Sequence, residues 1–359
     1  MTKKIESLKD INGIGEKSVQ KLNDIGINTL DDLKDADFYK IANSLGYVRA
    51  YKTKKQISDF VISYKKMEEV KEDNMNGSLV VGNKKITPRK EIKQLQPDEF
   101  ELETSTIWSF EERGDWATHD PSFRGNWSPK VARNLILRYS EVGDTVLDPM
   151  VGGGTTLIEC LLTGRNGIGM DVNLRSAMLT KNRINIPEKF IEKLPDTFQK
   201  VYTGDCRNLN QIDDESIDLI ATHPPYANII KYGKEALEGD LSAIPSYEIF
   251  ANEMKKAAKE FYRVLKPGKI CGILIGDTHK RCHYVPIAFK IMKEFLKEGF
   301  ILKEDVIKAQ WNCDSTPMWK NQDNDFLLTM HEHLFILRKP EKNEDINIYK
   351  NSSDSFIES

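Results

Sequence analysis

The sequence predicts an α/β fold, in which helices cover both faces of a mostly parallel sheet, preceded by a small all-α domain. Residues 145–147 are typical of the end of a buried parallel strand. A helix pattern follows, with apolar side chains on one face at Leu157, Ile158, Leu161 and Leu162. Gly164 is expected to cap this helix, and residues 168–171 form a second strand pattern that ends in an acid. Together these segments predict a nucleotide-type βαβ unit.

The turn between the first strand and the helix contains three consecutive glycines, residues 152–154. Glycine lets the backbone approach a ligand closely, and a helix that begins at Thr155 or Thr156 directs its free N–H groups toward that ligand. Asp171 lies about twenty residues beyond the turn, where a carboxylate can accept both hydroxyls of a ribose. A dinucleotide-binding fold is the weaker alternative, because Leu157 occupies the place of the third glycine in its fingerprint.

Two further motifs flank this unit. Asp148-Pro149 stands before the glycine turn, and Thr222-His223-Pro224-Pro225-Tyr226 follows another predicted strand at residues 217–221. In this order the motifs resemble those of the S-adenosylmethionine-dependent amino-methyltransferases of DNA, and the resemblance covers roughly residues 127–339. It implies a Rossmann-like class I methyltransferase sheet, mostly parallel with an antiparallel last strand, and S-adenosylmethionine as the cofactor.

The resemblance also implies which residues bind the cofactor. They lie in the glycine turn and at the ends of the predicted strands: Asp148, Pro149, Gly152, Gly154, Thr155, Thr156, Asp171, Asp205 and Cys206. In the family an acid after the third strand meets the adenine, and Asp205 is the matching residue, although a helix N-cap or turn aspartate is the alternative. Residues 126–129 are expected to help close over the methionine end of the cofactor, while helix capping and packing would explain them nearly as well.

The predicted chemistry rests on His223, Pro224, Pro225 and Tyr226. An exocyclic amino group is a poor nucleophile because its lone pair is delocalised into the ring, so an enzyme must hold its hydrogens with acceptors. The Pro224 carbonyl would accept one amino hydrogen, and Tyr226 would stack on a flipped base. His223 departs from the aspartate, asparagine or serine of the family, but a neutral imidazole can still accept one hydrogen bond. The alternative is a strand that ends in two prolines beside a packed tyrosine.

Neither thiol chemistry nor a metal site is predicted. Methylation at cytosine carbon 5 needs a thiolate, usually in a Pro-Cys pair, and none of the cysteines follows a proline: Cys160, Cys206, Cys271, Cys282 and Cys313. His279, Cys282 and His283 are close in sequence, but they lack a fourth ligand at the spacing of a structural zinc site. We therefore expect no metal.

The composition limits the class of protein. A chain of 359 residues is long enough for about two domains. Its 52 basic and 55 acidic residues give a net charge of -3, so any surface for nucleic acid must be local. No apolar segment resembles a signal peptide or a membrane span, and the scattered cysteines favour reduced thiols. We therefore expect no membrane partner and a cytoplasmic location.

The chain divides into four predicted parts. Residues 1–66 resemble a helix-hairpin-helix module, whose glycine turn presents backbone amides to a DNA phosphate; the residues implied are Gly13, Gly15, Lys17 and Lys21. This segment has 13 basic and 9 acidic residues, and a helical protein-interaction module is the alternative. Residues 67–98 are expected to be a linker, residues 99–339 the methyltransferase domain, and residues 340–359 a polar, disordered tail.

These observations predict a site-specific methyltransferase that acts on the amino group of a base flipped out of double-stranded DNA. Cytosine N4 is favoured over adenine N6, because a neutral His223 is closer to the serine of cytosine enzymes than to the acid of most adenine enzymes. The alternatives are a transfer-RNA guanine-N2 methyltransferase and an inactive nucleic-acid-binding protein that keeps the fold. A cognate restriction endonuclease could be a partner, and the loops at residues 227–245 and 310–324 are long enough to contact the substrate.

Overall fold

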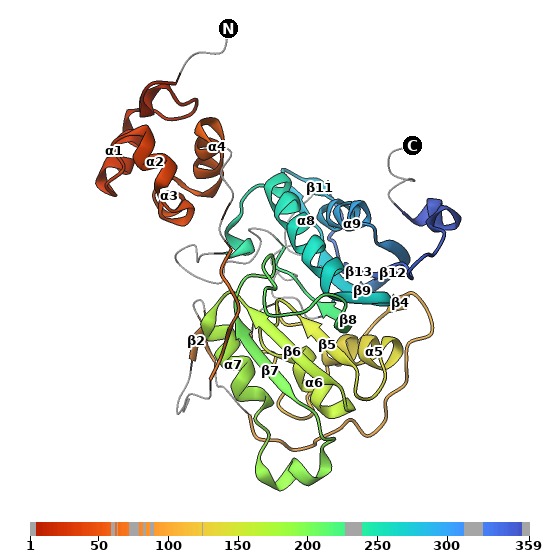
Figure 1. The fold of residues 1–359 in the computed structure, drawn as a ribbon. Coiled ribbons are helices and arrows are strands. Elements are labelled where there is room, and N and C mark those ends of the chain that lie inside the picture. Colours follow the sequence, from red (N-terminus) through yellow and green to blue (C-terminus); the bar gives the residue numbers. More distant parts are fainter. Residues whose placement is uncertain are drawn as a thin grey trace.

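The computed structural model of this chain describes residues 5–58, 62, 64–71, 79–81, 84–86, 90–123, 125–226, 239–311 and 326–353. Its centre is a nine-stranded sheet with the order β1-β7-β6-β5-β8-β9-β13-β12-β4 (Figure 1). These strands are β1 (Glu68–Glu69), β4 (Ile107–Trp108), β5 (Thr145–Asp148), β6 (Asn166–Asp171), β7 (Gln199–Thr203), β8 (Ile217–Thr222), β9 (Leu265–Gly276), β12 (Ile301–Ala309) and β13 (His331–Arg338). Two hairpins lie outside the sheet, β2 (Leu79–Val81) with β3 (Lys84–Ile86) and β10 (Thr278–Lys280) with β11 (His283–Val285).

The direction of the strands confirms the predicted doubly wound α/β fold. Strands β7, β6, β5, β8 and β9 are parallel, whereas β13 is antiparallel to both β9 and β12. From β5 the chain winds first outward through β6 and β7 and then back to β8 on the other side. In open α/β sheets, the crevice beyond the carboxyl ends of the strands at such a reversal is where ligands bind.

Helices cover both faces of the sheet because its central strands are apolar on both sides (Figure 1). Helices α5 (Pro129–Tyr139), α6 (Thr155–Thr163) and α7 (Leu174–Ile184) form one layer, and α8 (Tyr247–Val264) and α9 (Ile287–Lys297) form the other. Side chains alternate between the layers: Val146 and Leu219 pack with α5, while Leu147 and Ile220 pack with α8 and α9. Among the described residues, no helix is both long and apolar enough to cross a membrane.

Residues 5–58 form a small helical module, whose buried apolar side chains belong to the same hydrophobic cluster as those around α8 and α9. It contains the 3-10 turn η1 (Leu8–Asp10) and helices α1 (Glu16–Asp24), α2 (Leu30–Asp35), α3 (Phe38–Leu45) and α4 (Tyr47–Ile57). Gly13 has a φ of 88° in the turn before α1, Gly15 is the N-cap of α1, and a Cβ at either glycine would meet open space. Lys17 and Lys21 are exposed one turn apart on α1. Lys54 is buried instead, because its ammonium donates to backbone carbonyls at the end of α2.

The helical module contacts the sheet domain through the residues that follow β7. Arg207 Nη2 lies 3.5 Å from the hydroxyl of Tyr39 in α3. Just after the module, the carbonyl of Lys65 accepts from the backbone N–H of Asp205 at 3.2 Å. A truncation after residue 66 would remove both contacts, so point substitutions on the surface of the module are the cleaner test of its role.

The described parts of two segments that the sequence predicts to be unstructured include residues packed against the sheet domain. In the expected linker, β1 adds an edge strand beside β7, and Met67 and Ile92 are buried. In the expected disordered tail, η5 (Ile346–Ser352) is a 3-10 helix, and Arg338 forms an ion pair with Glu344 at 2.8 Å. These expectations differ from the structure because a few buried side chains and a local ion pair order segments whose average composition is polar.

Candidate active site

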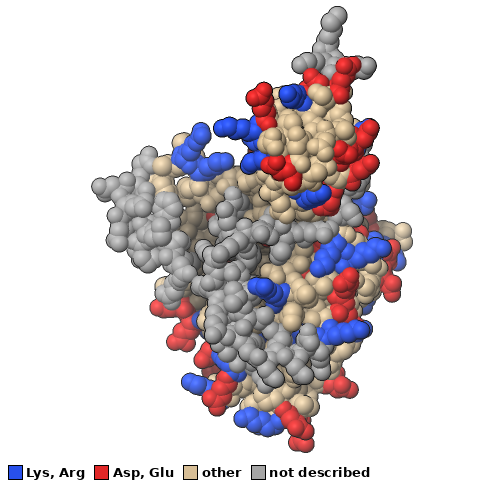
Figure 2. All heavy atoms as spheres, turned by 90° about the vertical axis from the view of Figure 1, so that its left-hand side faces the viewer, with Lys and Arg blue, Asp and Glu red and all other residues tan. Residues whose placement is uncertain are grey.

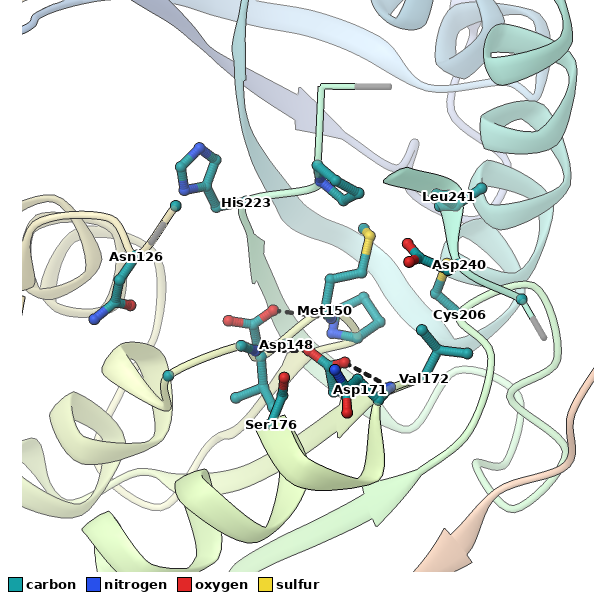
Figure 3. Close-up of a pocket in the computed structure, with 18 of the residues that line it drawn as sticks. Asn126, Asp148, Met150, Asp171, Val172, Ser176, Cys206, His223, Asp240 and Leu241 are labelled. Carbon is teal, nitrogen blue, oxygen red and sulfur yellow. Dashed lines mark hydrogen bonds between the residues drawn. The ribbon is translucent and has the colours of Figure 1, made fainter. Parts of the chain in front are cut away.

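A pocket opens where β5, β6, β7 and β8 end, and its empty space, including the open solvent at its mouth, is about 790 Å³. His223 lies at one end of the pocket, Asp240 and Cys206 lie at the other, and Asp148 and Asp171 lie between them (Figure 3). Its lining comprises Phe123, Gly125, Asn126, Trp127, Asp148, Pro149, Met150, Val151, Gly152, Gly153, Asp171, Val172, Asn173, Ser176, Gly204, Asp205, Cys206, His223, Pro225, Gly239, Asp240 and Leu241.

The structure brings most of the predicted site residues to this wall: Asp148, Pro149, Gly152, Asp171, Asp205, Cys206, His223 and Pro225. The other predicted residues of the site are absent from the described lining and lie beside these in the chain: Gly154, Thr155, Thr156, Pro224 and Tyr226. Of residues 126–129, Asn126 and Trp127 line the pocket, whereas Ser128 is the N-cap of α5 and Pro129 is its first residue. The first half of the segment therefore lies at the pocket, whereas the second half caps and begins α5.

Asp148 joins three parts of the site. It is 2 % exposed, and one carboxylate oxygen accepts from Thr222 Oγ1 at 2.9 Å and from the N–H of Met150 at 3.1 Å. The hydroxyl of Thr156 donates to the other oxygen. Burial raises the pKa of Asp148 to about 6, although these donors act in the opposite direction. The carboxylate thereby ties the ends of β5 and β8 to the first turn of α6.

The glycine turn needs glycine at two positions for different reasons. Gly154 is the N-cap of α6 and has a left-handed backbone, with φ 86° and ψ 12°, which glycine adopts without steric cost. At Gly153, a Cβ would lie 2.8 Å from Nη1 of Arg183, and that guanidinium donates to the Gly153 carbonyl at 2.9 Å. Arg183 is completely buried, so its side chain cannot simply move aside. The turn therefore presents bare backbone to the pocket.

Asp171 ends β6 with its carboxylate at the pocket. One oxygen accepts from the N–H of Asn173 at 2.8 Å, and the other accepts from the N–H of Gly152 at 3.1 Å. Burial raises the pKa of Asp171 to about 7; the two N–H donors oppose this rise, and the charges of Asp240 and Asp148 add to it. A carboxylate oxygen can accept more than one hydrogen bond, so both oxygens can also accept from a ligand.

Asp205 follows β7 and is paired with Arg207. Its two oxygens accept from Arg207 Nε at 2.8 Å and Nη2 at 2.6 Å, and both side chains are 1 % exposed. The same guanidinium donates to Glu253 of α8 and to the Gly239 carbonyl. A bidentate pair uses part of the accepting capacity of the carboxylate, so Asp205 builds the wall of the pocket whether or not it also meets an adenine.

The segment before α5 is held over the pocket by Arg113, a residue that sequence reasoning missed. Its guanidinium donates to the Asn126 carbonyl at 2.8 Å and to the Trp127 carbonyl, and its own carbonyl accepts from Ser128 Oγ at 2.8 Å. Burial lowers the pKa of Arg113 to about 10, which still leaves it charged at neutral pH. Arg113 thereby shapes the part of the wall that Asn126 and Trp127 form.

Glu159 on α6 is a second residue that sequence reasoning missed, and it binds side chains of the segment before α5 and of α5 itself. Its carboxylate is completely buried and accepts from Trp116 Nε1 at 2.7 Å, His119 Nε2 at 2.7 Å and Arg133 Nε at 2.6 Å. Burial would raise the pKa of Glu159, but His119 and Arg133 outweigh this and lower it. No local pattern in the sequence marks this glutamate, because its partners come from two other segments.

The end of β8 delivers His223 to the pocket, where its ring stacks on Trp127 with centroids 6.0 Å apart. Tyr226 does not line the pocket: its hydroxyl contacts His223 Nε2 and donates to Glu332 Oε1 at 2.6 Å. The ring of Tyr226 also lies so close to Gly276 that a Cβ there would be 2.6 Å away. The described contacts of Tyr226 therefore support His223, and its predicted stacking on a base stays a prediction.

Other residues of the site had no assigned role in the sequence. Asp240 and Leu241 line the pocket, and the Asp240 carboxylate accepts from the N–H of Ser242 at 2.8 Å to cap the short 3-10 helix η4 (Leu241–Ala243). Ser176 also lines the pocket, and it could have been predicted because it lies in the first turn of α7, the helix that follows Asp171. Most of the two predicted substrate loops, residues 227–238 of the first and 312–324 of the second, lies outside the described residues.

Within the described part of the chain, no group of three or more histidine, cysteine, aspartate or glutamate side chains could hold a metal ion. His279 and His283 belong to the hairpin of β10 and β11, and Cys282 lies in its turn. Burial raises the pKa of the thiols of three other cysteines, Cys160, Cys206 and Cys271. Such thiols are poor sources of a thiolate.

The strand order, the antiparallel β13 and the acid-lined pocket at the strand ends define a methyltransferase that uses S-adenosylmethionine. A family described as DNA methylase matches residues 15–182 and 217–358, so the chain belongs to that family. A family described as an RMKL-like methyltransferase domain matches residues 123–265.

Individual relatives are of two kinds. The tRNA (guanine(10)-N2)-dimethyltransferase of Methanocaldococcus jannaschii is 28% identical over 270 residues, which are 67% of this chain and 72% of that protein. The tRNA (guanine(10)-N2)-dimethyltransferase of Methanothermobacter thermautotrophicus is 37% identical over 105 residues, 29% of each chain. Type II methyltransferase M.MjaI of Methanocaldococcus jannaschii is 30% identical over 129 residues, 29% of this chain and 43% of that protein. The chain therefore spans less than half the length of the last two.

Among solved structures, a SAM-dependent methyltransferase of Methanosarcina mazei is 14% identical with a TM-score of 0.39, covering 57% of this chain and 96% of that chain. TrmN of Thermus thermophilus is 17% identical with a TM-score of 0.37, covering 60% of this chain and 50% of that chain.

Proposed function

We propose that this protein transfers a methyl group from S-adenosylmethionine to the exocyclic amino group of a base in DNA, with cytosine N4 preferred over adenine N6. The observation that carries the proposal is the place of His223. It stands at the end of β8 in the wall of the pocket, next to the two prolines of the motif. Burial lowers the pKa of His223 to about 4, so its ring is neutral near pH 7 and can accept a hydrogen bond.

The residues of the pocket fit the cofactor. Asp171 would accept the ribose hydroxyls, Asp205 would lie near the adenine, and the bare backbone of the glycine turn would allow close approach. Bound there, S-adenosylmethionine supplies an activated methyl group. The target amine would be oriented by two acceptors, His223 and the Pro224 carbonyl, which hold its hydrogens so that the nitrogen lone pair faces the methyl carbon.

The preference for cytosine rests on charge. His223 brings no formal charge to the amine, as the serine of cytosine enzymes does, whereas most adenine enzymes use an acid or its amide. A carboxylate at this position would also lie close to Glu332, whose Oε1 is 3.8 Å from His223 Nε2, and like charges at that distance repel.

Nucleosides from DNA treated with the full-length protein and S-adenosylmethionine test this proposal by mass spectrometry. We expect N4-methylcytosine. N6-methyladenine would reverse the base preference, and 5-methylcytosine would contradict the mechanism, because that product requires a thiolate.

The second candidate function is methylation of a guanine amino group in transfer RNA. It is supported by the match to the tRNA (guanine(10)-N2)-dimethyltransferase of Methanocaldococcus jannaschii, which extends over 67% of this chain. Parallel assays with transfer-RNA transcripts and DNA separate the two substrates, and transfer to neither would favour a binding protein without turnover. The Type II names of other relatives favour a restriction–modification role over RNA, with a cognate endonuclease as the expected partner.

The first prediction concerns the helical module. Figure 2 shows acidic and basic side chains interleaved on this module, so a DNA contact would be local. Lys17→Ala with Lys21→Ala should weaken DNA binding and reduce the slope of log affinity against log salt by about 1 for each lysine that pairs with a phosphate. Lys40→Ala, at an exposed position of α3, is the matched control and should leave the slope unchanged. An unaltered slope in the double variant would favour a protein partner for the module.

The second prediction concerns the pH dependence of cofactor binding. Because the pKa of Asp171 is raised to about 7 in the empty pocket, a fraction of this carboxyl is protonated at neutral pH. The cationic cofactor favours the ionised form, so binding should release a proton, and affinity should rise with pH toward a plateau above about 7, by at most about tenfold per pH unit. Calorimetry in buffers of different ionisation enthalpy measures both effects.

Asp171→Asn should flatten this dependence and weaken binding by about 1 to 3 kcal/mol. Asp213→Asn, an exposed aspartate before β8, is the control and should keep the wild-type profile. Equal pH profiles for wild type and Asp171→Asn would remove Asp171 from the cofactor site.

A further inference from the structure

Side chains from β12, from β13 and from the segment that follows β8 form a continuous chain of contacts beside the pocket. His223 Nε2 contacts the hydroxyl of Tyr226, and that hydroxyl donates to Glu332 Oε1 at 2.6 Å. Lys308 Nζ donates to the other oxygen of Glu332 at 2.8 Å, from the facing position on β12. Glu332 is only 5 % exposed, so water competes little for these bonds. We call Tyr226, Glu332 and Lys308 the relay.

The direction of the hydrogen bonds follows from the charge on Glu332. Burial would raise the pKa of this carboxyl, but Lys308, His223 and the hydrogen bonds of the relay outweigh this and lower it to about 2. An ionised carboxylate can only accept hydrogen bonds, so Tyr226 directs its single proton at Glu332. The phenol oxygen can then only accept from His223, which requires the histidine proton to be on Nε2.

The other ring nitrogen, Nδ1, is left with a lone pair. Burial lowers the pKa of His223 to about 4; Glu332 and the Gly125 backbone act against this, while Lys308 and Arg113 add to it. The ring is therefore neutral near pH 7 and carries one proton. Nδ1 is shielded from water and makes no hydrogen bond of acceptable geometry among the described residues, although the Gly125 backbone lies close enough to raise the pKa of the ring. His223 lines the pocket, so a ligand that displaces the Gly125 backbone from beside the ring would meet this acceptor.

We propose that the relay holds His223 in its Nε2–H tautomer, so that Nδ1 accepts a hydrogen of the amino group that is methylated. Resting on the proposed function, this inference adds Glu332 and Lys308 as positioning residues, because they act only through His223. The opposite tautomer would point an N–H at the amine, which has hydrogens of its own and a delocalised lone pair, so it could not orient that amine.

The bonds, charges and protons of the methyl transfer can all be accounted for when Nδ1 of His223 is the acceptor. As the amine nitrogen bonds to the methyl carbon, the carbon–sulfur bond breaks and its electron pair stays on sulfur, leaving neutral S-adenosylhomocysteine. The methylated nitrogen is then cationic and gives one proton to Nδ1 of His223. The imidazolium so formed lies 3.8 Å from the Glu332 carboxylate, which stabilises its charge until the proton passes to solvent with product release.

The tautomer can be measured directly, without substrate, on the full-length protein labelled with 15N-histidine. Long-range proton–nitrogen correlation spectra distinguish a protonated from an unprotonated ring nitrogen, and loss of one spin system in His223→Gln assigns the signals. We expect protonated Nε2 and unprotonated Nδ1 in the wild type near pH 7. A protonated Nδ1 would overturn the proposal.

Variants of the relay test whether it sets this state or only packs beside it. Tyr226→Phe keeps the ring and removes the hydroxyl, so we expect a mixture of tautomers and a fall in kcat of about 10- to 100-fold with little change in KM for S-adenosylmethionine. Lys308→Met should raise the pKa of Glu332 and move the acidic limb of the kcat profile to higher pH. Lys303→Met is the matched control, because Lys303 is on the same strand but lies over the ring of Tyr139. It should change neither the tautomer of His223 nor the pH profile of kcat.

The outcomes separate this inference from the proposed function. The expected tautomer in a protein that methylates no DNA would contradict only the proposed function. Methylated DNA together with a protonated Nδ1, or with an unchanged tautomer in Tyr226→Phe, would contradict only the relay.

Discussion

Replacing His223 with alanine is expected to lower kcat by about 10²- to 10³-fold, the effect typical of removing one preorganised polar group that orients a reacting centre. The loss arises because a methyl side chain cannot accept a hydrogen of the target amine, which would leave its lone pair delocalised into the base. The affinity for S-adenosylmethionine should change much less, because Asp171 and the glycine turn are untouched. Single-turnover methyl transfer to DNA and calorimetry with the cofactor measure the two quantities separately.

Two further variants sharpen this result. His223→Asn restores a neutral acceptor of the kind that the family uses, so it should recover most of the lost rate, whereas His223→Asp would place a second carboxylate near Glu332 and recover less. His283→Ala, at the exposed first residue of β11, is the control and should keep wild-type activity. Wild-type rates in His223→Ala would remove the histidine from the mechanism.

Replacing Glu159 with leucine is expected to lower the free energy of unfolding by about 3 to 5 kcal/mol, because it leaves buried partners uncompensated. Arg133 would lose the carboxylate 2.6 Å away, and Trp116 and His119 would lose the acceptor of their ring N–H groups. Urea denaturation monitored by tryptophan fluorescence reports this change. Because Trp116 and His119 belong to the segment that carries Asn126 and Trp127, the variant should also bind the cofactor more weakly.

An exposed glutamate provides the control for this second result. Glu192→Leu removes the same charge from the surface of the 3-10 helix η2 (Glu188–Lys193), and we expect a change within about 0.5 kcal/mol. Equal stabilities of Glu159→Leu and Glu192→Leu would show that the buried carboxylate contributes nothing net to folding. The stability of Glu159→Gln should lie between those of the two leucine variants. The amide oxygen still accepts hydrogen bonds, but it no longer neutralises the charge of Arg133.

The central part of the fold could be predicted because its signals are local. Strand β5, the glycine turn, α6 and β6 follow one another directly, and each is marked by periodicity or by residues that few other conformations tolerate. The antiparallel β13 was predicted from the family resemblance and is confirmed by its pairing with β9 and β12. Order in the described residues of the segment 67–98 and in residues 340–353 was not predicted, because it depends on a few contacts with other parts of the chain.

The sequence by itself determined which chemical groups reach the strand ends, since Asp148, Asp171 and His223 each follow directly from a strand that could be recognised. Only the tertiary structure decided what those groups face. The pairing of Asp205 with Arg207 and the contact of Tyr226 with Glu332 depend on how side chains meet in space. More than a hundred positions separate Tyr226 from Glu332 in the chain, and the two are brought together only because β13 enters the sheet beside β9.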